Sequence, residues 1–382
     1  MFKKYVQDIV GKNLYLNDFV YHQLFSKYVN EVENTLKDMK NDDYLIGIDS
    51  IKTFRKDIDK YNRVWHTRNV NWDNLHWYGN WRELFGKNFQ EESVNTPCVE
   101  HGLIFHNNIF FDVRNTARST CATFSVFRKN IIQKITNIPV FCVGSYIYYA
   151  DSFYNAESLK KFKEYYGKVL LVFPTHSTEK AELTTNQKLF LENIKKYAKN
   201  FDSILINAFW WNINDPLIEL LSAEGYKIVT CGFRCDVNFL SRLKAYIMLS
   251  DLVMGDSVGT HIGYCLANNI PFSYIPAVTK VKLLDRCENK DIDFVEMHQN
   301  KIAEAFLNAT EITDKQREIV DYYWGNNLFK TEEEIKAIVE INREITDITY
   351  GFTDFRCSAA KKLLKKYADT DEVKYRLLKD AL

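Results

Sequence analysis

The feature that most constrains the fold is a regular alternation of short apolar runs and amphipathic stretches between residues 168 and 271. The runs have the length and unbroken apolar character of buried parallel strands, and each is followed by apolar residues at helical spacing. This order predicts a parallel sheet with right-handed crossovers and with loops gathered at one edge. The expected strands cover residues 168–174, 203–208, 226–232 and 252–255.

The last of these strands runs into a turn-rich loop that opens a helix. Asp256 begins the loop, and Ser257, Gly259, Thr260 and His261 follow at the expected helix N-terminus. Free N–H groups and the helix dipole favour an anion at such a position. The same pattern is also that of an ordinary helix cap with a glycine turn. The sequence therefore indicates either an anion site or a simple cap.

The first strand of the series ends in a second polar group. Thr175, His176, Ser177 and Thr178 follow the apolar run, where they would face the crevice in which ligands of such sheets bind. A helix cap beside a solvent-facing histidine is the equal alternative.

Residues 96–102 form another short expected strand, which ends in Glu100, His101 and Gly102. A histidine at a strand end titrates near neutral pH and can take a proton from a nearby hydroxyl. We therefore expect His101 to be the best candidate for a general base. The alternative is a loop histidine whose nitrogens are satisfied by backbone carbonyls.

A segment crowded with aromatic and polar residues precedes this strand. Trp72, Trp77 and Trp81 lie in it, and indole faces provide large contact areas for sugar rings. A local aromatic mini-core under a long loop is the slightly favoured alternative. A further apolar run at residues 44–49 predicts the first strand of the chain.

Composition limits the class of protein and its partners. With 382 residues the chain is long for one core, so two domains are expected, and 46% hydrophobic with 26% charged residues is typical of a soluble globular protein. Lys+Arg and Asp+Glu are equal at 50 each, which gives no electrostatic case for nucleic acid. No apolar run of about 18 residues is present, so we expect neither secretion nor a membrane span.

Metal sites are not indicated. The eight cysteines form no CxxC pair, and Cys231 and Cys235 have no nearby histidine to complete a zinc site. The Asp-x-Asp pairs at residues 57–59 and 291–293 lie in charged segments that are typical of solvated helices. We expect no essential metal and no cofactor.

The chain ends in helical patterns, among them a short lysine-rich helix at residues 359–367. Clustered basic residues beside apolar ones can contact an anionic membrane surface. The apolar face of this helix is short, so a solvated helix end is the favoured interpretation and peripheral membrane contact the alternative.

Together these motifs resemble the GT-B class of nucleotide-sugar glycosyltransferases, of the type that builds bacterial surface polysaccharides and capsules. The likeness rests on residues 251–261, which look like a donor-phosphate loop, and on the turn at residues 269–271. The region also resembles the CDP-glycerol polymerising transferases and the UDP-sugar 2-epimerases. In the polymerising transferases a strand-end His-Gly supplies the base, which corresponds to His101-Gly102 here. The His-Pro pair of several sialyltransferase groups is absent, which argues against a CMP-sialic acid donor.

The resemblance implies an α/β fold of two Rossmann-like domains facing a cleft, with helical N- and C-terminal extensions. Residues 1–155 would form the acceptor-side domain, 156–330 the donor-binding domain and 331–382 a helical extension. His101 would be the base, assisted by Glu100. The donor nucleotide would be bound by two groups of residues, His176, Ser177 and Thr178 together with Asp256, Ser257, Gly259, Thr260 and His261.

The implied activity is inverting, metal-independent transfer of a sugar from a nucleotide-sugar to a hydroxyl of a glycan or glycolipid, in the cytoplasm or at the inner face of the membrane. Trp72, Trp77 and Trp81 would contact the acceptor. An epimerase that uses Glu100, Asp256 and histidines is the first alternative. A non-catalytic nucleotide- or sugar-binding protein of the same fold is the second.

Overall fold

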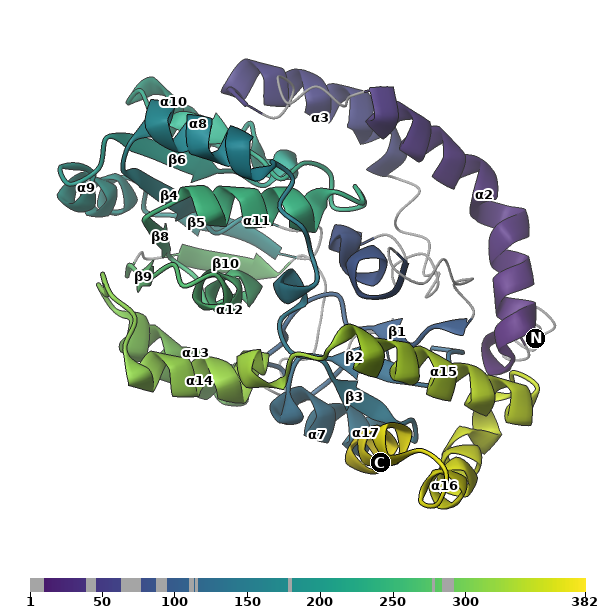
Figure 1. The fold of residues 1–382 in the computed structure, drawn as a ribbon. Coiled ribbons are helices and arrows are strands. Elements are labelled where there is room, and N and C mark those ends of the chain that lie inside the picture. Colours follow the sequence, from purple (N-terminus) through teal and green to yellow (C-terminus); the bar gives the residue numbers. More distant parts are fainter. Residues whose placement is uncertain are drawn as a thin grey trace. The chain divides into compact units, whose positions relative to one another are not determined.

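The computed structural model describes residues 10–38, 46–62, 77–86, 95–109, 113, 116–177, 181–276, 279–283 and 292–382. The chain divides into two compact units (Figure 1). Unit 1 comprises residues 1–31, 67–150 and 320–382, and unit 2 comprises residues 32–66 and 151–319.

Unit 2 is built on a five-stranded parallel sheet in the order β7-β6-β4-β8-β9. The chain starts at β4, adds β6 and β7 on one side, and then adds β8 and β9 on the other. The order reverses between β4 and β8, and open parallel sheets bind ligands at the carboxyl ends of strands at such a point. The predicted alternation of strands and helices is confirmed. The strands are β4 (Val169–Phe173), β6 (Ser203–Asn207), β7 (Lys227–Val229), β8 (Leu252–Gly255) and β9 (Phe272–Tyr274).

One face of this sheet packs against the helices at residues 48–62, 187–198 and 216–223. Leu170, Val172 and Ile206 point to the same face because strand side chains alternate, and they form one buried cluster with Phe190 and Leu217. Side chains cap the helices α8, α9 and α10 by accepting from their first-turn N–H groups. The helices of this unit are α3 (Ile48–Asn62), α8 (Ala156–Tyr166), α9 (Gln187–Ala198), α10 (Pro216–Ala223), α11 (Phe239–Leu249), α12 (Thr260–Ala267) and α13 (Ile292–Phe306).

A strand was predicted at residues 44–49, and the structure corrects its described part, residues 46–49. It also adds a pair of strands that was not predicted. Ile46 forms only an isolated bridge to Val229, and helix α3 begins at Ile48. Gly47 turns the chain with a φ of 91° and donates its N–H to the carbonyl of Ile228, so the apolar residues that follow pack as a helix. The unpredicted strands β5 (Ala181–Thr185) and β10 (Thr279–Leu283) pair with each other in antiparallel fashion.

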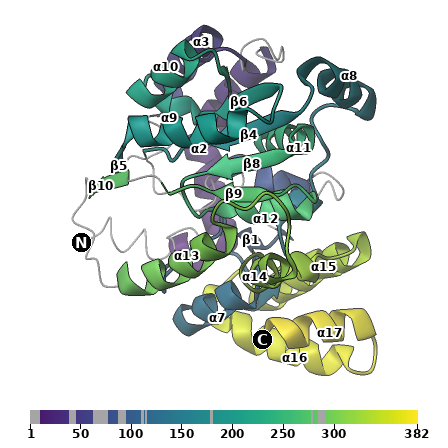
Figure 2. The same cartoon turned by 90° about the vertical axis from the view of Figure 1, so that its left-hand side faces the viewer.

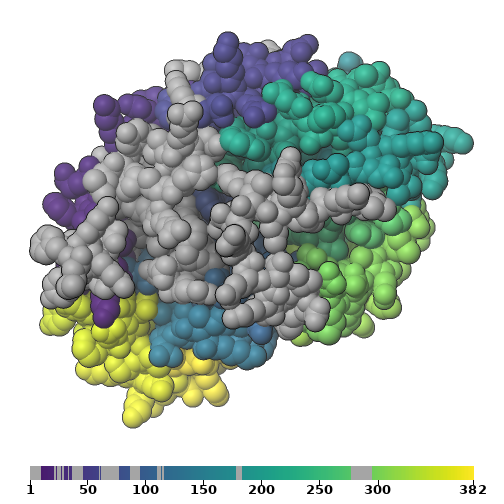
Figure 3. All heavy atoms as spheres, turned by 180° about the vertical axis from the view of Figure 1, so that it is seen from behind, coloured from purple at the N-terminus to yellow at the C-terminus, as the bar shows by residue number. Residues whose placement is uncertain are grey.

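Unit 1 contains a three-stranded parallel sheet in the order β1-β2-β3. In Figure 3 the C-terminal residues, in yellow, lie beside blue residues of the same unit. Ser119 and Thr346 share a buried hydroxyl hydrogen bond of 2.7 Å, and Thr120 donates to Asn342 at 2.8 Å. These bonds fix α15 to the sheet. The strands are β1 (Cys98–Val99), β2 (Cys121–Thr123) and β3 (Val140–Cys142).

One of the remaining helices of unit 1 lies between β2 and β3 in the sequence. The helices α16 and α17 run side by side (Figure 2). None of the described helices is both long enough and apolar enough to cross a membrane. The α/β class with parallel sheets is confirmed, and the cleft between two domains stays a prediction. The helices are α7 (Val126–Ile135), α15 (Glu332–Thr349), α16 (Arg356–Tyr367) and α17 (Glu372–Ala381), while α2 (Leu14–Asp38) and α14 (Asp314–Trp324) each span a boundary between the units.

Candidate functional site

The two polar loops singled out in the sequence meet where the strand order of unit 2 reverses. Thr175, just after β4, donates from its backbone N–H and from its hydroxyl to one carboxylate oxygen of Asp256, at 2.8 and 2.7 Å. Asp256 follows β8 directly and is only 6% exposed. The carboxylate therefore joins the two loops. One of its oxygens accepts both hydrogen bonds from Thr175, which is the geometry of a group that positions a site.

His261, in the first turn of α12, is held between two aromatic rings. It stacks on Phe173 at a centroid distance of 5.1 Å and meets Phe272 edge-on at 5.2 Å. Its Nε2 is buried and has no hydrogen-bond partner among the described residues. Burial, and secondly the proximity of His176, lower its pKa from 6.5 to about 4. The ring is therefore neutral at pH 7.

The N-cap residue of α12 is Gly259, which has an extended conformation and no side chain to cap the helix. A Cβ at Gly259 would lie 3.1 Å from Nδ1 of His261, so glycine leaves room for the imidazole. The N–H groups and the dipole at a helix N-terminus favour an anion. Ser257 and Thr260 flank this position in the same loop.

His176 and Ser177 lie at the end of β4, close to this loop. The His176 side chain is exposed, and its ring packs at 4.4 Å on Phe209, which follows β6. The hydroxyl of Ser177 accepts from the backbone N–H of Leu183 at 3.1 Å, so it fastens the loop to β5. Thr178 lies outside the described residues.

The buried neutral state of His261 predicts a loss of stability in mild acid. Its pKa is about 4 when folded, against 6.5 in an unfolded chain. Stability is therefore complete above pH 6.5 and falls as the pH drops toward 4, because the unfolded state binds the extra proton. Between pH 7 and pH 5 we expect the wild type to lose about 2 kcal/mol of unfolding free energy more than His261→Phe, measured by urea titration. Equal losses in the two proteins would show that His261 is accessible and freely protonated.

In unit 1, the structure brings His101 together with the aromatic segment. Trp77 meets the imidazole of His101 edge-on at 4.5 Å, and the side chain of Asn80 donates to the His101 carbonyl at 2.8 Å. Tyr78 and Gly79 both have positive φ values, of 59° and 69°, which turn the chain so that Trp77 reaches the histidine. The imidazole is thus placed by its neighbours in the aromatic segment.

Glu100, next to His101, is fully buried in an ion pair. Its carboxylate accepts from Nε of Arg128 at 3.1 Å and from the hydroxyl of Thr123 at 2.6 Å. Arg128 is also fully buried and donates to the carbonyls of His106 and Asn108. The pair ties the end of β1 to α7 and to the following loop. Glu100 is committed to these partners, so its contacts favour positioning His101 over meeting a substrate.

The tryptophans proposed for the acceptor have different surroundings. Trp81 donates its indole N–H to Thr96 at 2.7 Å, and its ring covers Gly86, which agrees with an aromatic mini-core. Trp77 remains partly exposed beside His101. Trp72 lies outside the described residues. Of the two tryptophans that the structure describes, Trp77 is the one whose place favours contact with a ligand at His101.

Some residues of the site were not singled out in the sequence. Thr175 was named only as part of a polar group, and its pairing with Asp256 depends on the register of β4 against β8. Arg128 is the second such residue, because its local sequence gives no sign that it would be buried. Among the described residues, no group of three His, Cys, Asp or Glu side chains could hold a metal ion.

No protein-family model and no curated protein matches the chain. Its structure is similar to that of a UDP-GlcNAc 2-epimerase from Neisseria meningitidis bound to UDP-GlcNAc, with 16% identity and a TM-score of 0.32 over 60% of this chain and 61% of that one. The wall teichoic acid polymerase TagF is similar with 13% identity and a TM-score of 0.29, over 70% of this chain and 60% of that one. UGT2 of Phytolacca americana, complexed with UDP-2fluoro-glucose and pterostilbene, is similar with 11% identity and a TM-score of 0.25, over 68% of this chain and 55% of that one. The chain thus spans less than two thirds of each of these proteins.

Proposed function

We propose that unit 2 binds the phosphates of a nucleotide-sugar at the N-terminus of α12, and that the chain transfers the sugar to a hydroxyl of a glycan or glycolipid. The observation that carries this proposal is the joining of the β4 and β8 loops by Asp256 and Thr175 at the reversal of strand order. That position is where open parallel sheets bind ligands. It also holds the N-terminus of α12, where the N-cap residue is a glycine, and a helix N-terminus suits phosphate.

In this proposal the residues of unit 2 have distinct roles. Backbone N–H groups of the first turn of α12, with the hydroxyls of Ser257 and Thr260, bind the phosphates. Gly259 lets the phosphate approach the backbone. Asp256 positions the loop through Thr175, since a carboxylate in direct contact would repel phosphate. His176 and neutral His261 supply polar contacts and shape.

The proposed reaction is an inverting displacement without a covalent intermediate. His101 takes the proton of the acceptor hydroxyl as that oxygen bonds to the anomeric carbon. The bond from that carbon to the phosphate oxygen breaks, and the electron pair leaves with the nucleotide. The helix N-terminus stabilises the charge that builds there. No residue role in this scheme requires a metal, and Trp77 would contact the acceptor.

The alternative functions give the carboxylates of Glu100 and Asp256 different roles. An epimerase would use Glu100 and Asp256 for elimination and re-addition, but both carboxylates are already held by protein donors. Labelled nucleotide-sugars distinguish the cases. Transfer to an acceptor supports the transferase, an isomerised donor supports the epimerase, and binding without turnover indicates a non-catalytic protein.

Because nucleotide-sugars are cytoplasmic metabolites, the proposal places the reaction in the cytoplasm or at the inner face of the membrane, in surface-polysaccharide or capsule synthesis.

Replacing Thr260 with valine tests the phosphate site. The change keeps the volume and removes one hydroxyl, so nucleotide affinity should fall by about 1 kcal/mol or more if that hydroxyl contacts phosphate. Isothermal titration with the best-binding nucleotide measures the loss. Thr53→Val on α3 is the matched control, because its hydroxyl bonds only to the carbonyl of Asp49. Unchanged affinity in Thr260→Val would leave that residue a helix-capping role alone.

A further inference from the structure

Unit 1 carries an exposed apolar surface formed by two segments that are distant in the sequence. From α2 come Tyr15, Leu16 and Phe19, of which Phe19 is 62% exposed. After α15 come Tyr350, Phe352 and Phe355, of which Tyr350 is 78% exposed. Exposed apolar side chains are common singly, but a contiguous group marks a place of interaction. These six residues are called the aromatic surface.

Backbone contacts make the aromatic surface continuous. The N–H of Leu14 donates to the carbonyl of Gly351 at 2.9 Å, and the side-chain amide of Asn13 donates to the backbone carbonyl of Tyr350 at 3.0 Å. Gly351 has a φ of 76° and lies against the ring of Tyr15, where a Cβ would come within 2.8 Å. The start of α2 is therefore fastened to the turn after α15.

Lysines of α16 border the aromatic surface. The helix has the sequence RCSAAKKLLKKY, which contains no acidic residue. Phe355, Lys362 and Lys366 are separated by seven and four residues, a spacing that puts them on one helix face. Lys362 has no ion-pair partner within the part of the chain that the structure describes, and it is exposed. The helix thus presents unneutralised positive charge next to exposed aromatic rings.

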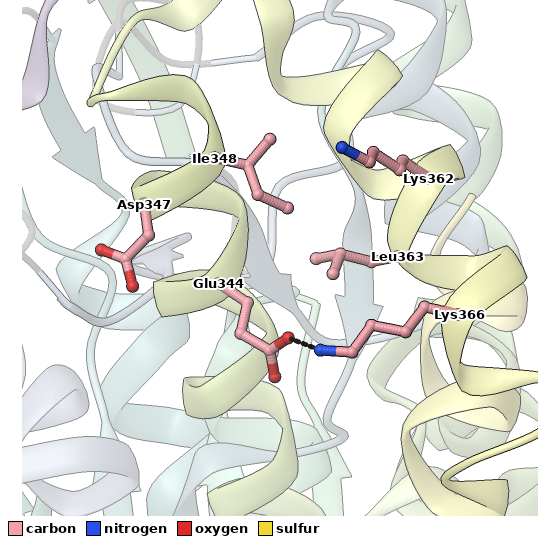
Figure 4. A pocket seen from close by; sticks show the side chains of 6 residues that line it. All are labelled: Glu344, Asp347, Ile348, Lys362, Leu363 and Lys366. Carbon is pink, nitrogen blue, oxygen red and sulfur yellow. Dashed lines mark hydrogen bonds and ion pairs between the residues drawn. The ribbon is translucent and has the colours of Figure 1, made fainter.

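A pocket of about 260 Å³ lies between α15 and α16 (Figure 4). Ile348 of α15 and Leu363 of α16 face each other in it, with Lys362 and Lys366 along one side. Glu344 pairs with Lys366 at 3.0 Å, and Lys374 also pairs with Glu344 at 3.1 Å, so that carboxylate is neutralised. The remaining lining residue is Asp347.

Asp347 connects this pocket to α2. Partial burial, and secondly the nearby Asp347 carboxylate, raise the pKa of the Tyr15 hydroxyl above its ordinary value. The aromatic surface, the pocket and the lysines are therefore neighbours on one side of unit 1.

The combination of groups decides between possible partners. Tyrosine and phenylalanine rings suit the interface of a bilayer, where one end is apolar and the other is wet, and lysines are attracted to anionic headgroups. A symmetric contact with a second copy would apply the same patch to itself and bring the α16 lysines of both copies toward each other. Like charges disfavour that pairing. The chemistry therefore favours a lipid surface.

We propose that the aromatic surface and the lysines of α16 bind unit 1 to an anionic lipid bilayer. The rings insert among the headgroups, and the lysines contact lipid phosphates. The apolar area that the sequence of α16 alone does not provide comes from α2 and from residues 350–355.

Vesicle co-sedimentation tests this proposal with the full chain. The probes are vesicles of phosphatidylcholine alone and vesicles with 30 mol% phosphatidylglycerol added, at low and high salt. We expect binding to the anionic vesicles only, weakened by salt. Lys362→Gln combined with Lys365→Gln should lower the partition coefficient about 30-fold, which is about fivefold for each lysine. Phe19→Ser combined with Phe352→Ser should lower it by a similar factor or more.

Matched controls come from unit 2. Lys160→Gln combined with Lys199→Gln removes two exposed lysines, and Tyr165→Ser removes a ring that is 76% exposed. Both should bind vesicles like the wild type, and circular dichroism should show every variant folded. Absence of wild-type binding to anionic vesicles, or equal binding by surface and control variants, would overturn the proposal. So would a dimer that the surface variants dissociate while vesicle binding is unchanged.

Discussion

His101→Ala should lower turnover by about 10²–10⁴-fold, the usual effect of removing a general base. Nucleotide affinity should remain near its original value, because the proposed donor site belongs to unit 2 and His101 to unit 1. The imidazole is only partly buried and its main contact is the edge of Trp77, so the melting temperature should move little. Measuring kcat, KM and nucleotide Kd on the same preparations separates these effects.

Two further variants make this test specific. His106→Ala changes an exposed histidine of the same unit and should keep wild-type turnover. Trp77→Phe keeps an aromatic edge beside His101 and should change KM for the acceptor more than kcat. Full activity in His101→Ala would place the base elsewhere, with His106 and His176 the next candidates. Unfolding of His101→Ala would instead assign the imidazole a structural role.

Arg128→Met should cost about 3–5 kcal/mol of stability, the largest effect that we expect from a single substitution. Methionine retains much of the side-chain stem but leaves the Glu100 carboxylate buried without its partner. Two carbonyls, of His106 and Asn108, lose a donor as well. Urea unfolding at pH 7 measures the loss, and activity should fall with it because the end of β1 holds His101.

The control for this ion pair is an exposed one in the same unit. Arg376 pairs with Glu334 at 2.8 Å, and its side chain is 60% exposed. Arg376→Met should therefore cost about 1 kcal/mol or less. Adding Glu100→Gln to Arg128→Met removes the stranded charge and should recover part of the loss. Similar costs for Arg128→Met and Arg376→Met would contradict the structural importance of the buried pair.

The fold of unit 2 could be predicted because its sequence patterns are local. The run that became β4 is apolar throughout, and the following polar residues mark its end within one position. The segment 44–49 was misassigned because a short apolar run has the same composition in a strand and in the first turn of a buried helix. What decided the outcome was Gly47 and its hydrogen bond to Ile228, a partner 181 residues away. No local pattern contains that information.

The sequence could predict which residues follow the strands of unit 2, but not the contacts that these residues make. Asp256, Thr260 and His261 were found because turn residues before a helix are visible in sequence. That Asp256 bonds to Thr175 follows from β4 and β8 being neighbours, and that Glu100 is neutralised follows from the burial of Arg128. Both are long-range packing outcomes. Sequence spacing indicates which residues share an edge of a sheet, but it does not indicate which carboxylate is already paired.

The most direct test of nucleotide binding by unit 2 is a crystal structure with a bound nucleotide. A thermal-shift panel of CMP, CDP, UDP and GDP would first select the ligand, because a compound that binds only the folded state raises its apparent stability. We expect the phosphates at the N-terminus of α12, within hydrogen-bond distance of the Thr260 hydroxyl and of backbone N–H groups in that first turn. A nucleotide bound wholly against unit 1, with the α12 N-terminus unoccupied, would contradict this assignment.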